Sequence, residues 1–185
     1  MRKVNIGLVG CGTVGSGVVK GLARNGALMG SRLGVRFSLG GVAVRNPRKA
    51  RAARLSRGLV TSDWESLVRD PKIDVVMELM GGTTTARKVV AEALKLGKPV
   101  ITANKALISA YGESIFRLVE KNGGNLYYEA SVAGGIPIIK SLREGLSGNR
   151  IQRLYGILNG TCNYILTQME AEGRDFEDVL ADAQQ

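Results

Sequence analysis

Short apolar runs alternate with longer amphipathic stretches along most of this chain. The runs are rich in valine and isoleucine, which is typical of buried strands, and the longer stretches repeat their apolar residues at helical spacing. Strands that alternate with helices predict an α/β fold built on a doubly wound parallel sheet. The expected strands are residues 4–9, 35–44, 73–79, 98–102 and 125–129; the expected helices are 14–25, 63–69, 85–96 and 111–122.

Two local signals refine this pattern. Ser62 and Glu65 match a capping box, so Ser62 is expected to cap the short helix over 63–69. A helix is expected from Pro137 to residue 146. From Arg150 the character changes, and we expect a strand over 151–158 and helices over 162–172 and from 176. The predicted organisation is a Rossmann-type domain over 1–130, followed by the start of an α+β domain over 131–185.

The first strand breaks into the sequence Gly10-Cys-Gly12-Thr-Val-Gly15 where the first helix pattern begins. At such a junction Gly10 permits a tight turn, Gly12 lets the backbone approach a pyrophosphate, and Gly15 lets the helix pack closely on the strand. The helix N-terminus, with its free N–H groups, would hold the phosphates. The pattern favours dinucleotide binding over an ordinary glycine-containing turn.

Composition removes several classes of function. The chain has no histidine, so catalysis near neutral pH must use lysine, carboxylate, tyrosine or cysteine. Its two cysteines indicate neither a disulfide framework nor a metal cluster. No apolar run reaches the roughly 18 residues of a membrane helix. The N-terminal run enters the glycine turn without a cleavage site, so we expect a cytoplasmic protein with no membrane partner.

Basic residues are concentrated in the first third of the chain. Residues 1–62 contain twelve lysines and arginines and no acid. In an NAD-binding unit an acid ends the second strand and holds the ribose 2′-hydroxyl; here Arg45, followed by Arg48 and Lys49, stands where a 2′-phosphate would lie. The pattern therefore favours NADP, with NAD as the alternative. Nucleic acid is not expected as a partner, because Phe37 is the only aromatic residue in the basic segment.

A second glycine turn and a lysine follow later strands. The turn at 80–84, with Gly81 and Thr83, comes at the carboxyl end of a strand, where open α/β sheets bind ligands. Lys105 follows the next strand, beside the expected nicotinamide, where it can donate a hydrogen bond or a proton to a carbonyl.

Longer motifs make the sequence similar to the homoserine dehydrogenase family. The agreement includes the turn at 10–15, Glu-Leu-Met-Gly-Gly at 78–82, Thr-Ala-Asn-Lys-Ala-Leu at 102–107, Tyr-Glu-Ala-Ser-Val-Ala-Gly-Gly-Ile-Pro at 128–137 and Gly-Ile-Leu-Asn-Gly-Thr-Cys-Asn-Tyr-Ile at 156–165. The resemblance implies NAD(P)-dependent interconversion of aspartate semialdehyde and homoserine, in the route from aspartate to threonine and methionine.

The resemblance also assigns roles to single residues. It implies that Thr13 and Val14 contact the pyrophosphate, that Arg45 contacts the adenosine phosphate, and that Thr83 and Lys105 contact the nicotinamide half, with Lys105 as the catalytic candidate. It implies a monovalent cation such as sodium, bound by the Glu129 carboxylate and by the carbonyls of Val132, Gly134 and Ile136. Gly160 and Thr161 match the turn that opens the substrate pocket.

The resemblance stops short in one respect. The family's principal catalytic lysine, and the acids that hold the amino acid, match nothing before Gln185. We therefore expect this chain to be an N-terminal portion of an enzyme that is a homodimer at full length, and to bind NADP(H) weakly with negligible turnover. The alternative is a nucleotide-binding or regulatory module without catalysis.

Overall fold

The computed structural model describes residues 1–47, 55–157 and 159–184. The chain divides into two compact units, Met1–Gly134 and Gly135–Gln185. The first unit is built around a six-stranded sheet in the order β3-β2-β1-β4-β5-β6, in which every neighbouring pair is parallel. Its strands are β1 (Arg2–Val9), β2 (Val35–Ala43), β3 (Val60–Thr61), β4 (Val75–Glu78), β5 (Val100–Thr102) and β6 (Leu126–Tyr127).

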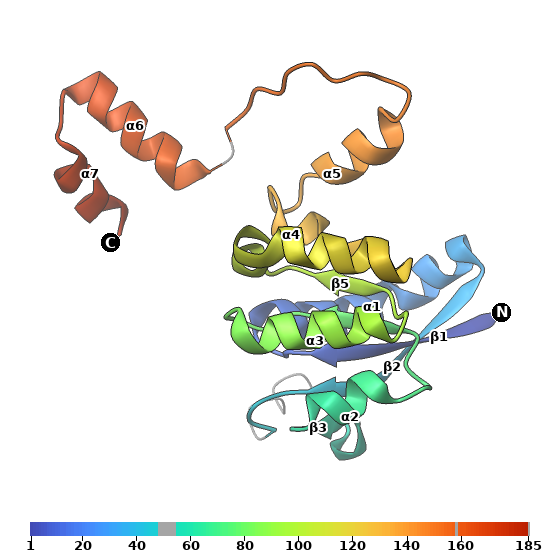
Figure 1. Cartoon of the computed structure of the whole chain (residues 1–185). Helices are drawn as coiled ribbons and strands as arrows, with labels where there is room; N and C mark the ends of the chain where they lie inside the picture. Colours follow the sequence, from blue (N-terminus) through green and yellow to red (C-terminus); the bar gives the residue numbers. More distant parts are fainter. Residues whose placement is uncertain (48–54, 158, 185) are drawn as a thin grey trace. The chain divides into compact units, whose positions relative to one another are not determined.

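Helices cover both faces of this sheet, which confirms the doubly wound α/β prediction. Helix α1 (Thr13–Leu33) lies on one face, and α3 (Thr84–Lys95) and α4 (Lys105–Asn122) lie side by side on the other (Figure 1). A strand–helix–strand crossover is almost always right-handed, so connections that leave β1 in opposite directions place their helices on opposite faces. Short helix α2 (Trp64–Arg69) packs beside α3.

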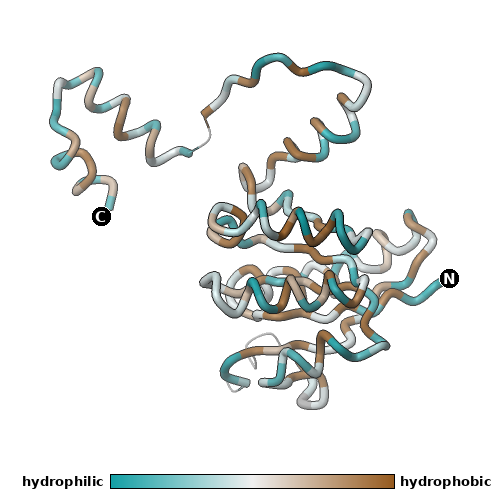
Figure 2. The backbone as a smooth tube through the Cα atoms, in the orientation of Figure 1, coloured by the Kyte–Doolittle hydropathy of each residue, from teal (hydrophilic) through white to brown (hydrophobic). Residues whose placement is uncertain are grey.

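The main hydrophobic core lies between the sheet and helices α2, α3 and α4. Hydrophobic residues run along the strands, whereas hydrophobic and hydrophilic residues alternate along α3 and α4 (Figure 2). Val76 and Val100 on the central strands pack with Val89, Val90 and Leu94 of α3, all fully buried. Burying a side chain of this size stabilises the fold by about 1.5–3 kcal/mol, so the core fixes the strand ends on which the candidate site is built.

The first helix is longer than the sequence predicts. The expected end at residue 25 rested on the following glycines, but α1 continues to Leu33 and ends at Gly34, whose φ is 67°. Gly30 explains the difference, because a Cβ there would lie 2.5 Å from the Val35 carbonyl oxygen. The glycine lets the last turn of the helix pack directly against the start of β2, and this packing outweighs its low helix propensity.

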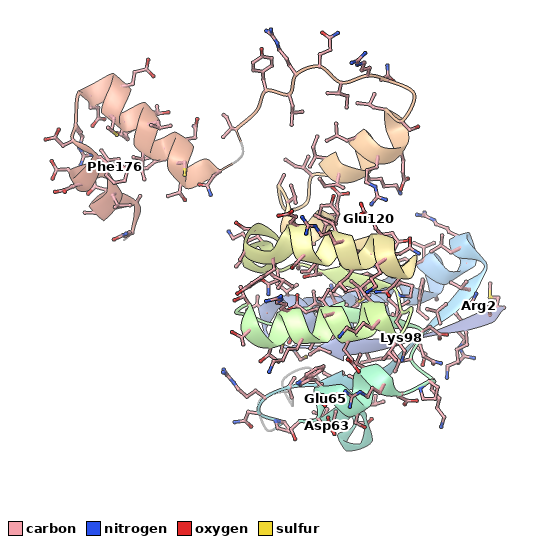
Figure 3. The ribbon with its side chains drawn as sticks, viewed as in Figure 1. Arg2, Asp63, Glu65, Lys98, Glu120 and Phe176 are labelled. Atoms are coloured by element: carbon pink, nitrogen blue, oxygen red, sulfur yellow. The ribbon has the colours of Figure 1, made fainter. Side chains whose placement is uncertain are left out.

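The cap of α2 is Asp63 rather than Ser62, so the predicted capping box is wrong by one residue. The Asp63 carboxylate accepts a hydrogen bond from the Ser66 N–H at 2.9 Å, and the Asp63 N–H donates to the Thr61 hydroxyl. Asp63 and Glu65 lie at the start of α2 in Figure 3. A carboxylate is also favoured there by the helix dipole.

Removing this cap should therefore destabilise the first unit. We expect Asp63→Ala to lower the free energy of unfolding by about 1 kcal/mol and Ser62→Ala to change it by less than about 0.5 kcal/mol. Urea denaturation followed by circular dichroism measures both. Equal losses in the two variants would contradict the assignment of the cap.

Other elements also differ from the prediction, and β3 was not among the expected strands. Helix α4 begins at Lys105 rather than at 111, because Asn104 caps it. The expected strand over 125–129 is limited to β6 and is followed by a short 3₁₀ turn, η3 (Glu129–Ser131). Residues 151–157 form no strand, and no described segment pairs with them. An extended segment becomes a strand only when a neighbour satisfies its backbone groups.

The regular elements in the described part of the second unit are all helical. It contains α5 (Ile138–Lys140), which continues as the π-helical turn η4 (Ser141–Gly145), and then α6 (Gly160–Glu172) and α7 (Phe176–Ala183). Helices α6 and α7 pack against each other, and Arg174 in the connection between them forms an ion pair with Asp182. No helix in the described chain is long and apolar enough to cross a membrane.

Lys98 connects the amino end of the sheet to the end of α2. Its ammonium donates hydrogen bonds to the carbonyl oxygens of Val68 at 2.7 Å and Asp70 at 2.6 Å, at the end of α2. Burial lowers the pKa of Lys98, and the carboxylates of Asp70 and Asp74 partly offset this effect. Lys98 lies at the end of the sheet where Arg2 begins β1 (Figure 3). It is therefore structural and distant from the carboxyl ends of the strands.

Candidate functional site

The candidate site lies along the carboxyl ends of the central strands. There β1 pairs with β2 on one side and with β4 on the other. The Gly10 N–H donates to the Ala43 carbonyl oxygen at 2.9 Å, and the Leu79 N–H donates to the Val9 carbonyl oxygen at 2.8 Å. The chain leaves these strands in opposite directions, and parallel α/β sheets bind ligands in the crevice at such a point.

The three glycines of the first turn differ in what a side chain at each position would meet. Gly10 has a φ of 98°, and a Cβ there would lie 2.6 Å from the Leu79 carbonyl carbon. A Cβ on Gly15 would lie 2.2 Å from the Gly10 carbonyl oxygen. A Cβ on Gly12 would meet nothing within 4 Å. The fold thus requires Gly10 and Gly15, whereas Gly12 keeps open the space above the turn.

Helix α1 presents its N-terminus to this open space. Gly12 is its N-cap and supplies no side-chain hydrogen bond, and Thr13 and Val14 in the first turn are exposed. The first N–H groups of a helix have no partner within the helix, and they carry part of its positive dipole. Together these groups can bind an anion such as a pyrophosphate.

Arg45 lies at the end of β2, two residues beyond Ala43. The strand end is fixed, because Ala43 accepts the Gly10 N–H and the Val44 N–H donates to the Thr61 carbonyl oxygen. Arg45 itself is exposed and free of helix or strand geometry. Its place beside the glycine turn suits contact with the adenosine end of a dinucleotide. The neighbouring Arg48 and Lys49 lie outside the described residues.

The segments that follow the carboxyl ends of β4 and β5 contribute Gly81, Thr83 and Lys105. Gly81 is exposed, and Gly82 has a φ of 80° in the turn after β4. Thr83 is the N-cap residue of α3, but its hydroxyl makes no capping hydrogen bond. Lys105 is the exposed first residue of α4. The sheet therefore brings all the predicted nucleotide-binding residues to one edge of the first unit.

A buried polar network beneath this edge was not predicted from the sequence. Glu78, Thr102 and Asn104 are buried, and Glu78 is fully so. The Thr102 hydroxyl donates to the Glu78 carboxylate at 2.6 Å, and Asn104 lies 3.5 Å from its other oxygen. Burial raises the pKa of Glu78, although the hydrogen bonds from Thr102, Met80 and Asn104 act in the opposite direction. The available signal was an acid that ends an apolar strand.

The predicted cation ligands lie in the segment that follows β6. Glu129 begins η3, and its carbonyl oxygen accepts the Val132 N–H at 3.1 Å. Ala133 has a φ of 51°, which is uncommon for a residue with a side chain. Gly134 ends the first unit, and Ile136 belongs to the second. No cluster of three or more acids and cysteines suited to a metal occurs among the described residues.

The predicted substrate residues begin α6 in the second unit. Gly160 and Thr161 are its first two residues, and both are exposed. The Asn159 side chain caps the helix by accepting the Cys162 N–H at 2.9 Å. The Asn-Gly-Thr motif thus begins α6, two residues before the expected start of the helix at residue 162.

The fold and the glycine turn after β1 together define the class of protein. A parallel sheet in this order, with a glycine turn that opens a helix at the reversal point, is a Rossmann-type dinucleotide-binding domain. The residues present fit such a cofactor, because the turn leaves room where a Cβ would otherwise project and the adjoining helix offers its N-terminus.

Comparison with known proteins then gives the family. The model for the NAD-binding domain of homoserine dehydrogenase matches residues 10–129, and the homoserine dehydrogenase model matches residues 137–185. The chain is 45% identical to a homoserine dehydrogenase of Pseudomonas aeruginosa and 41% identical to that of Bacillus subtilis, over its whole length. It covers 42% of each of these relatives.

Solved structures agree with this comparison. A homoserine dehydrogenase from Thiobacillus denitrificans matches with a TM-score of 0.85 at 47% identity, over 100% of this chain and 42% of that one. A hyperthermophilic archaeal homoserine dehydrogenase mutant in complex with NADPH matches with a TM-score of 0.77 at 26% identity, over 99% of this chain and 61% of that one. The chain belongs to the homoserine dehydrogenase family, as its motifs predicted.

Proposed function

We propose that this chain supplies the cofactor-binding part of an NADP-dependent oxidoreductase that interconverts L-aspartate 4-semialdehyde and L-homoserine, in the route to threonine and methionine. Membership of the family supports the reaction. The crevice above β1 carries the proposal for this chain, because its glycine turn and helix N-terminus suit a pyrophosphate. The chain spans about two fifths of the curated relatives it matches, so the reaction is proposed for the whole protein.

In this proposal the two halves of the sheet hold the two halves of the cofactor. The N–H groups at Thr13 and Val14 donate to the pyrophosphate, and Gly10, Gly12 and Gly15 allow the backbone to approach it. Arg45 contacts the adenosine 2′-phosphate. The reduced nicotinamide, when bound, supplies a hydride to the aldehyde carbon.

Groups on the second half of the sheet orient the reacting ends. Gly81 leaves room beside the nicotinamide, and the Thr83 hydroxyl donates to it. Lys105 projects from the start of α4, where its ammonium donates a hydrogen bond to a carbonyl and stabilises developing negative charge on the substrate oxygen. It is the catalytic candidate of this chain.

The remaining assignments rest on the family resemblance. Glu129, with the carbonyls of Val132, Gly134 and Ile136, is proposed to bind a monovalent cation such as sodium; oxygen ligands suit a hard cation, and the positive φ of Ala133 supports a specialised turn. Gly160 and Thr161 are proposed to contact the amino-acid substrate. A homodimer and a cytoplasmic location also stay predictions.

Nucleotide titration tests the proposal in the 185-residue chain. We expect NADPH to bind more tightly than NADH, and Arg45→Ala to weaken NADPH about 10- to 100-fold, because a charge-assisted hydrogen bond is worth about 1.5–3 kcal/mol. NADH affinity should change by less than about twofold. Fluorescence of the reduced nicotinamide reports binding.

Arg36→Ala is the matched control for this experiment. Arg36 is an exposed arginine at the amino end of the same strand, so its loss changes the net charge equally but lies far from the crevice. Equal weakening by both substitutions would show only a general charge effect. Absence of nucleotide binding by the unmodified chain would overturn the proposal. We expect this chain to oxidise NADPH negligibly in the presence of aspartate semialdehyde, and appreciable formation of homoserine would contradict that expectation.

A further inference from the structure

The buried network of Glu78, Thr102 and Asn104 makes more hydrogen bonds than the capping of α4 alone requires. Glu78 ends β4, and its register partner on β5 is Thr102. One carboxylate oxygen of Glu78 accepts the Thr102 hydroxyl at 2.6 Å, and the other accepts the Met80 N–H at 2.9 Å. The side chain of Glu78 is fully buried. A buried carboxylate is costly unless donors surround it, so this arrangement demands an explanation.

Asn104 extends the network to two ligand-facing segments at once. Its amide N–H₂ donates to the Gly82 carbonyl oxygen at 2.7 Å and to the Met80 carbonyl oxygen at 3.3 Å. Its amide oxygen accepts the Leu107 N–H at 3.0 Å, which begins α4. The same side chain therefore fixes both the turn at 80–82 and the start of the helix that carries Lys105.

Thr102 connects Glu78, Asn104 and a third segment. Its hydroxyl donates to Glu78 and also accepts the Asn104 N–H at 3.0 Å. Its carbonyl oxygen accepts the Ser131 hydroxyl at 2.9 Å, in η3. The three buried side chains thus hold the segments that follow β4 and β5, and the Thr102 carbonyl adds a contact to η3.

We propose that Glu78 is a positioning residue that, through Thr102 and Asn104, holds Thr83 and Lys105 in place for the nicotinamide half of the cofactor. This inference rests on the proposed function. The first half of the sheet holds the adenosine end in dinucleotide-binding domains, which leaves the nicotinamide end to β4 and β5. The recorded contacts of Glu78 all lie in that second half.

A carboxylate is suited to this role because all its recorded partners in the described chain are donors. Glu78→Leu would leave the Met80 N–H and the Thr102 hydroxyl without their acceptor, whereas Glu78→Gln keeps one carbonyl oxygen for them. Burial raises the pKa of Glu78, whereas the hydrogen bonds from Thr102, Met80 and Asn104 lower it, so these donors favour the charged form. The two variants therefore separate loss of the acceptor from loss of the charge.

The test compares two ligands in the 185-residue chain. One is NADPH; the other is 2′-phosphoadenosine diphosphate, which lacks the nicotinamide. We expect Glu78→Leu to weaken NADPH binding about tenfold or more and to change the affinity for 2′-phosphoadenosine diphosphate by less than about twofold. Glu78→Gln should recover most of the lost NADPH affinity. A general loss of structure would weaken both ligands equally.

Asp74 provides the matched control. It precedes β4 at the opposite end of the same strand, where its carboxylate accepts the Asn5 N–H at 2.7 Å. Asp74→Leu also removes one carboxylate and its hydrogen bond, and we expect it to leave the affinities for both ligands unchanged. Urea denaturation measures the stability of each variant, and we expect the two losses to be comparable.

The outcomes distinguish the inference from the function beneath it. If the unmodified chain binds neither ligand, the proposed function fails. If it binds both and Glu78→Leu weakens both equally, or neither, the positioning role is wrong. Should Glu78→Leu not fold, Thr102→Val and Thr102→Ser carry the test: valine removes the hydroxyl, serine keeps it, and only valine should weaken NADPH selectively.

Discussion

Replacing Gly12 with leucine is expected to weaken NADPH binding at least about 100-fold, which corresponds to about 2.7 kcal/mol, without unfolding the protein. A Cβ at Gly12 meets nothing within 4 Å, so the protein itself has room for a side chain. The φ of Gly12 is −80°, which needs no glycine. The added side chain would occupy the space that the pyrophosphate needs for its close approach to the backbone.

The control for this substitution lies in the same helix. A Cβ at Gly26 also meets nothing within 4 Å, and this residue lies more than three turns beyond the crevice. Gly26→Leu should leave NADPH affinity unchanged. Fluorescence titration gives the affinities and urea denaturation gives the stabilities. If Gly12→Leu bound NADPH as well as Gly26→Leu does, the nucleotide would not lie over the turn.

The sequence predicts the sheet and the first turn well because both depend on local information. Apolar runs of β-branched residues mark buried strands, and a glycine turn at a strand-to-helix junction needs no distant partner. The handedness of the crossovers then fixes which face of the sheet each connecting helix covers. The positions of Gly10, Arg45, Thr83 and Lys105 along one edge could thus be predicted from the sequence.

The buried network could not be predicted in the same way. Glu78 is an acid inside an apolar run, and its partners Thr102 and Asn104 are 24 and 26 residues away in the chain. The register between β4 and β5 brings Glu78 and Thr102 together. Sequence patterns give the strands but not this register, so the hydrogen bonds appear only in the structure.

The wrong boundaries also have physical causes. Asn104 is a favoured N-cap residue, and this signal could have placed the start of α4 at Lys105. The segment 151–157 fails as a strand for another reason, because its exposed apolar residues, such as Leu154 and Ile157, suit a sheet that no described segment supplies. Strand propensity depends on neighbours in a way that helix capping does not.

Replacing Gly15 with alanine should have the opposite character to the change at Gly12, because it destabilises the fold itself. A Cβ at Gly15 would lie 2.2 Å from the Gly10 carbonyl oxygen, and this backbone atom cannot move aside as the end of a flexible side chain can. We expect the free energy of unfolding to fall by more than about 3 kcal/mol. Gly21→Ala is the control in the same helix: its Cβ meets nothing within 4 Å, so alanine should raise stability by about 0.5–1 kcal/mol. Urea denaturation measures both changes, and a gain in stability for Gly15→Ala as large as that for Gly21→Ala would show that no close approach of α1 to the turn requires glycine at position 15.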